Sequence, residues 1–146
     1  MISALEIVAT LASGLFAGAA LYVNVAEHPA RMELETRVAV AQWAPSYKRA
    51  TWLQAPLAVL SFLTGGAAWV LGAGTGWLWG ALLVGSVVPF TFIAIMPTNN
   101  KLLDPARDPN SPETRALLNK WSQLHGVRTA LSMVAFGVYL WMLRET

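Results

Sequence analysis

The sequence contains no cysteine and few charged residues. Without cysteine there is no disulfide framework, no cysteine-based zinc site and no cysteine nucleophile. Charged residues make up 12% of the chain, which is about half of what a soluble domain usually carries. The formal net charge of +2 is too small to indicate a polyanionic partner, so the sequence does not predict nucleic-acid binding.

What the sequence does contain is a long apolar run. No Lys, Arg, Asp or Glu occurs from Ala50 to Asn100. A soluble protein of this size cannot bury such a run, because too much of its surface would then be apolar. A membrane span needs about 20 apolar residues, so the run predicts two spanning helices joined by the glycine-rich turn at residues 72–76.

We expect an all-α integral membrane protein: a four-helix bundle that forms a single domain over residues 1–146. The expected spans cover residues 5–26, 51–71, 77–96 and 124–143. No Lys or Arg precedes the first span, so we interpret it as a retained helix and not as a signal peptide.

Proline and serine predict where these helices begin and end. Pro29 and Pro97 are expected to end the first and third helices, because proline lacks the backbone N–H that a helix interior needs. Ser111-Pro112 is typical of a helix start, with serine as the N-cap and proline at the first helical position. The fourth helix is therefore expected to be extended, running from there to Arg144 and beginning outside the membrane.

The basic residues predict the orientation of the bundle. Nine of the ten Lys and Arg residues lie in the two long connections or, for Arg128, near the start of the fourth span, and only Arg144 lies at the other side. By the positive-inside rule, these connections are cytoplasmic and both termini lie outside the inner or plasma membrane. Between the first two spans, Leu34, Val38 and Ala41 recur at helical spacing, which predicts a short amphipathic helix along the cytoplasmic interface.

The first span also carries a pair of small residues, Gly14 and Gly18. This spacing lets a neighbouring helix approach closely in a membrane. The neighbour is either another helix of the same bundle or a second copy of the chain, and the pattern leaves a homo-oligomer open.

Unusual polar and aromatic residues collect near the cytoplasmic ends of the expected helices. Asn24 and His28, four residues apart, are expected on one face of the first helix, and Trp121, His125 and Arg128, at i, i+4 and i+7, on one face of the fourth. Pro89 is expected either to kink the third helix or to open a pocket beside Thr91. Polar groups at the edge of the hydrocarbon usually face the bundle interior. The candidate site therefore comprises Asn24, His28, Trp43, Tyr47, Thr91, Asn99, Asn100, Trp121, His125 and Arg128.

Three segments resemble a known family. They are Pro89-Phe90-Thr91, Met96-Pro97-Thr98-Asn99-Asn100-Lys101-Leu102 and Trp121-Ser122-Gln123-Leu124-His125-Gly126-Val127-Arg128. Together they are similar to the shared pattern of small four-helix membrane proteins grouped as the DUF1772, or anthrone oxygenase-like, family. The resemblance covers nearly the whole chain. It implies a membrane bundle and, for the few members with an assigned role, oxidation of an anthrone to an anthraquinone by O2 without a metal or flavin.

The candidate residues suit that implied chemistry. An anthrone is an acidic ketone whose conjugate base can pass an electron to O2 directly, so a base, a pocket and charge stabilisation suffice. Histidine titrates near neutral pH, and His125 or His28 is the expected base. The expected donors to the developing oxyanion are Arg128, Asn99 and Asn100. The rings expected to stack on a flat aromatic substrate from the bilayer are Trp121, Trp43 and Tyr47.

Two other functions remain open at this point. His28 and His125 on neighbouring helices would suit haem or a metal ion in a membrane redox protein. Alternatively, the same pocket would bind a lipid or small amphiphile without catalysis. The expected partners are thus the lipid bilayer and, for the oxygenase, O2 and a hydrophobic aromatic molecule, with no cofactor.

Overall fold

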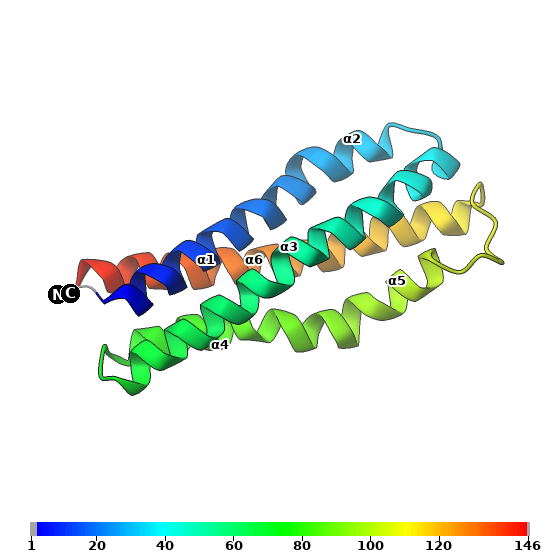
Figure 1. Ribbon diagram of the computed structural model, residues 1–146. Coiled ribbons are helices and arrows are strands. Elements are labelled where there is room, and N and C mark those ends of the chain that lie inside the picture. The colour runs from blue at the N-terminus through cyan, green and yellow to red at the C-terminus, as the bar shows by residue number, and fades with distance from the viewer. Residues whose placement is uncertain (1–2, 146) are drawn as a thin grey trace.

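The structure, a computed structural model, describes residues 3–145 and is built from four long helices (Figure 1). Each is long and apolar enough to cross a membrane, and they cover Ala4–Met32, Thr36–Val70, Thr75–Leu102 and Pro112–Arg144. Consecutive helices run antiparallel and pack side by side, and the first also packs against the last. This is the predicted all-α membrane bundle, and residues 3–145 contain no strand.

The first and third helices each contain a wider, π-helical segment. The elements in chain order are α1 (Ala4–Tyr22), η1 (Val23–Glu27), α2 (His28–Met32), α3 (Thr36–Val70), α4 (Thr75–Phe90), η2 (Thr91–Ile95), α5 (Met96–Leu102) and α6 (Pro112–Arg144). Both π segments lie in the half of the bundle away from the first and last helical residues.

The prediction that Pro29 and Pro97 end their helices was wrong. Each proline follows a π segment, where the backbone N–H of His28 bonds to the Val23 carbonyl and that of Met96 bonds to the Thr91 carbonyl. The bonding register thus shifts immediately before each proline, and the helix continues past a residue that has no N–H to donate. As a result, the first and third spans reach further than their predicted ends.

The amphipathic segment predicted between the first two spans is not a separate interfacial helix. Only residues 33–35 separate α2 from α3, and the segment forms the first turns of α3. Ala39 and Trp43, four residues apart, are fully buried there against the other helices. The residues of the predicted apolar face, Leu34, Val38 and Ala41, all remain exposed, so a different face of this segment packs into the bundle.

The ends of the bundle agree with the predicted topology. The start of α1, the end of α6 and the α3–α4 turn lie at one end, and the other two connections lie at the opposite end (Figure 1). The predicted start of α6 is confirmed, since the Ser111 side chain accepts from the Thr114 N–H and Pro112 is the first helical residue. Which end faces the cytoplasm stays a prediction.

Tyr139 fills the interior of the bundle in the half nearer the termini. Its ring stacks on Trp77 at 5.1 Å between centroids, and its hydroxyl donates to the Ser61 carbonyl at 3.3 Å. Gly65 and Gly80 make room for it, because a Cβ at Gly80 would lie 2.4 Å from the Tyr139 ring. Close approach of helices at glycine is therefore used inside the bundle.

Gly14 and Gly18, the predicted packing pair on α1, lie in different environments. A Cβ at Gly14 would lie 2.8 Å from the Phe136 ring of α6, so Gly14 serves packing within the bundle. A Cβ at Gly18 would meet nothing within 4 Å. Contact with a second copy through this face stays a prediction.

We expect Gly80→Ala to destabilise the bundle by about 1–3 kcal/mol, the usual cost of overpacking a filled core. Thermal unfolding in detergent measures this loss. Gly18→Ala is the matched control and should be neutral or slightly stabilising, because alanine is the better helix former and the position is open. Equal melting temperatures for the two variants would contradict the assigned packing.

Candidate active site

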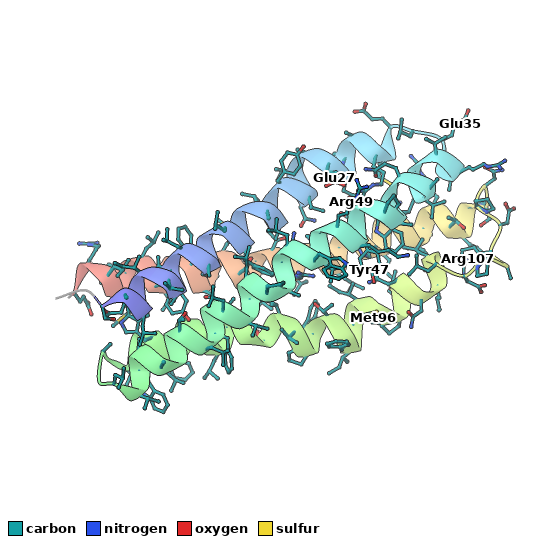
Figure 2. All side chains as sticks on the ribbon, in the orientation of Figure 1. Glu27, Glu35, Tyr47, Arg49, Met96 and Arg107 are labelled. Carbon is teal, nitrogen blue, oxygen red and sulfur yellow. The ribbon has the colours of Figure 1, made fainter. Side chains whose placement is uncertain are left out.

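A cavity of about 130 Å³ lies in the half of the bundle away from the termini, lined mainly by α3, α4–η2–α5 and α6. It lies between two buried clusters, one around Phe16 and Val84 and the other around Trp43 and Trp121. Six of the predicted site residues line it: Tyr47, Thr91, Asn99, Trp121, His125 and Arg128. Figure 2 labels two lining residues, Tyr47 on α3 and Met96 at the start of α5, which mark two sides of the cavity.

α6 supplies the polar wall of this cavity. Trp121, His125 and Arg128 line it together, as their spacing on one helix face predicted. The Trp121 and His125 rings stack with their centroids 4.9 Å apart. The indole therefore limits how far the imidazole can rotate.

Asn24 orients His125 from the neighbouring helix. Its Nδ2 donates to the Ser122 carbonyl at 3.1 Å, which turns its Oδ1 toward α6. That oxygen lies 2.7 Å from His125 Nδ1 and also accepts from the Thr129 hydroxyl. Because an amide oxygen only accepts, Nδ1 carries the imidazole proton and Nε2 keeps its lone pair. Asn24 itself does not line the cavity; it acts on the residue that does.

Arg128 is held inside the bundle by contacts with two other helices. Its Nη2 donates to Gln54 Oε1 at 2.8 Å, and its guanidinium lies over the Phe16 ring at 5.0 Å. Gln54 is only 2% exposed and also lines the cavity. Gln54 was not among the predicted site residues, although a glutamine within an uncharged spanning helix is itself a signal of a functional position.

Three buried polar atoms of the lining residues have no hydrogen-bond partner among residues 3–145. They are Asn99 Oδ1, Trp121 Nε1 and Arg128 Nε. An unpaired polar group in a membrane interior carries a free-energy cost unless a ligand satisfies it. The lining residues thus offer one acceptor and two donors in addition to His125 Nε2.

The other predicted residues lie outside the cavity. Trp43 supports its wall, since its ring stacks on Tyr47 at 5.0 Å and meets the edge of Trp121 at 5.8 Å. Asn100 is exposed on the outer surface, one residue beyond the buried Asn99. The helix turn separates these two amides, and only Asn99 faces inward.

His28 contacts Trp121 but does not line the cavity. Arg31 Nη1 lies 3.1 Å from His28 Nδ1. Because arginine only donates, Nδ1 is the acceptor and the proton is on Nε2, which is buried without a partner in the described part of the chain. Both histidine rings pack against Trp121, and no hydrogen bond joins them within residues 3–145.

A buried polar cluster around Arg31 ties α2 to α3. Arg31 is only 3% exposed and forms an ion pair with Glu27. It also donates to Gln42 and Ser46, and the Ser46 hydroxyl, which lines the cavity, donates to Glu27. From the sequence, Arg31 was expected only to add positive charge to the predicted cytoplasmic side. The acidic residue four positions earlier was the available signal of pairing.

Comparison with known proteins follows this geometry. Residues 43–138 match the sequence model of the anthrone oxygenase family. This range includes the six predicted lining residues and Gln54. A curated relative, anthrone oxygenase tpcL of Aspergillus fumigatus, is 38% identical over 66 residues, which cover 43% of this chain and 41% of the relative. The matched segment is therefore less than half of that relative. No solved structure matches the chain.

We expect the two histidines to adopt opposite neutral tautomers, with the proton on Nδ1 in His125 and on Nε2 in His28. Nitrogen NMR of protein labelled only in histidine measures this at alkaline pH, where both rings are neutral. The chain has two histidines, so His28→Gln assigns the spectrum. Two imidazoles with the same tautomer would contradict the roles of Asn24 and Arg31.

Proposed function

Because the chain belongs to the anthrone oxygenase family, we propose that it oxidises a flat phenolic ketone of the anthrone class with O2, using His125 as the general base. The observation that supports this most directly is the pairing of His125 Nδ1 with Asn24, which leaves Nε2 as a free base beside the cavity. A base must be oriented before it can take a proton, and the contact with Asn24 on another helix supports such an orientation for His125.

The reaction balances with the ketone and O2 alone. The anthrone methylene carbon loses two hydrogens and gains one oxygen atom, and the second oxygen atom leaves as water. His125 Nε2 takes the first proton, and the resulting enolate passes one electron to O2. The two radicals combine to form the C–O bond, and the protonated His125 returns its proton to the peroxide. Loss of the remaining C–H proton then breaks the O–O bond and releases water and the quinone.

The other lining residues suit the charge that develops. The enolate oxygen needs positive charge or donors, which the Arg128 guanidinium and the Trp121 indole N–H supply. Gln54 keeps Arg128 pointing into the bundle. Asn99 Oδ1 is the natural acceptor for a phenolic hydroxyl, and Tyr47 offers a ring that is already ordered by stacking on Trp43.

We expect His125→Gln to lower turnover by about 100-fold or more, the usual contribution of a positioned base. Oxygen uptake with 1,8-dihydroxyanthrone measures turnover, and binding of its oxidation product, 1,8-dihydroxyanthraquinone, should be retained. His28→Gln is the comparison: His28 lies outside the cavity, so its loss should be much smaller. A larger loss for His28→Gln would make that residue the base.

The same preparations test the two other functions. Binding of the anthraquinone without oxygen uptake by the parent protein would indicate a non-catalytic binder. A haem or metal absorption band that disappears in both histidine variants would indicate the redox protein. In the structure His28 Nδ1 is occupied by Arg31, so joint ligation would require His28 to leave that contact.

We expect Asn99→Ala to lower kcat/KM by about five- to tenfold, as for one lost ligand hydrogen bond. The effect should be smaller on a substrate that lacks one phenolic hydroxyl, because the partner of Asn99 is then already absent. Asn119→Ala, on the exposed face of α6, is the control and should behave as the parent. Equal losses on both substrates would show that Asn99 does not contact the phenol.

A further inference from the structure

The cavity is open on one side. The lining residues Val23, Trp121 and His125 are buried and form its closed side. In contrast, Thr51 and Ala55 of α3 and the facing Val88 and Phe92 line the cavity while being exposed on the outside of the bundle. These four residues, which we call the mouth, place the opening between α3 and the α4–η2 junction.

The mouth faces lipid. Both of its sides belong to helices that are long and apolar enough to span the membrane. It lies within the uncharged run that begins at Ala50, one turn beyond the exposed basic residues Lys48 and Arg49. Basic side chains at that level are typical of the headgroup boundary, so the mouth lies just inside the hydrocarbon.

The hydroxyl groups at the rim of the mouth are already hydrogen-bonded and are not available to a ligand. The Thr51 hydroxyl donates to the Tyr47 carbonyl at 2.9 Å, and the Thr91 hydroxyl next to the mouth donates to the Val87 carbonyl at 2.7 Å. Both donors are thus used within their own helices. The groups that remain available, His125 Nε2 and Asn99 Oδ1, are on the lining residues further inside.

Small side chains provide the space for passage. α3 contributes three alanines to the lining, Ala50, Ala55 and Ala58, and Ala55 is exposed at the mouth itself. A flat ring system is the shape that a slot between two helices admits. Its oxygenated edge would reach the polar interior, and its hydrocarbon edge would remain at the apolar rim.

We propose that the aromatic ligand enters the cavity sideways from the bilayer, through the mouth formed by Thr51, Ala55, Val88 and Phe92. The identity of the ligand, a flat phenolic ketone, rests on the function proposed above. The route rests only on the mouth and its contact with lipid, and it therefore has a test that needs no turnover.

The first test narrows the mouth. Ala55→Trp places a large ring at the opening, and in liposomes that contain 1,8-dihydroxyanthrone kcat/KM should fall about tenfold, because that ratio includes capture of the substrate. Leu53→Trp is the matched control, since Leu53 is 57% exposed on the same helix and does not line the cavity. Helical circular dichroism and gel filtration verify that both variants fold.

The second test uses the absence of cysteine from the chain. Ala55→Cys and Leu53→Cys each carry a single thiol, which is labelled with N-ethylmaleimide in liposomes. Saturating 1,8-dihydroxyanthraquinone should slow the labelling of Ala55→Cys severalfold and leave that of Leu53→Cys unchanged.

The outcomes separate the route from the reaction. Protection of Ala55→Cys in a protein without oxygen uptake supports the route and overturns the proposed function. Oxygen uptake that Ala55→Trp leaves at the parent level overturns the route and keeps the function. Labelling of Ala55→Cys at the same rate with and without the anthraquinone also overturns the route.

Discussion

Hydrocarbon offers no hydrogen-bond partner to a protein backbone, and this constraint shapes the whole molecule. Pro29 and Pro97 lie within spanning helices, where a missing N–H would leave a carbonyl unpaired. The π segments before them shift the bonding register, so the helices continue. That continuation brings Asn99 on α5 to the level of His125 on α6. The candidate site thus depends on how Pro97 is accommodated.

Much of this was predictable from the sequence. The uncharged run identified spanning helices, Ser111-Pro112 marked the start of α6, and the spacing of Trp121, His125 and Arg128 placed them on one face. These inferences rest on local rules. The π segments were not predictable, because a one-residue register shift depends on packing with neighbouring helices. The rotation of each helix about its own axis was also not predictable. The sequence therefore did not show that Asn99 and Gln54 face inward or that Asn100 faces outward.

In the two histidines, the hydrogen-bond partner decides which ring nitrogen carries the proton. His125 receives an acceptor, Asn24 Oδ1, whereas His28 receives a donor, Arg31. The lone pair of the imidazole therefore lies on Nε2 in His125 and on Nδ1, against Arg31, in His28. Trp121 contacts both imidazole rings, although their hydrogen-bond partners differ. Sequence spacing placed both histidines at one end of the bundle but did not distinguish them.

The packing of Tyr139 has a consequence for the membrane itself. Beyond the cavity, the bundle is filled by two successive buried clusters, one around Phe16 and the other around Trp77 and Tyr139. The cavity is therefore a blind recess, closed toward the end that carries the termini. A polar cavity that crossed the bilayer would conduct water and ions and would dissipate the membrane potential. Glycine-based packing at Gly65 and Gly80 lets the protein keep a cavity with buried polar side chains in the bilayer without creating such a leak.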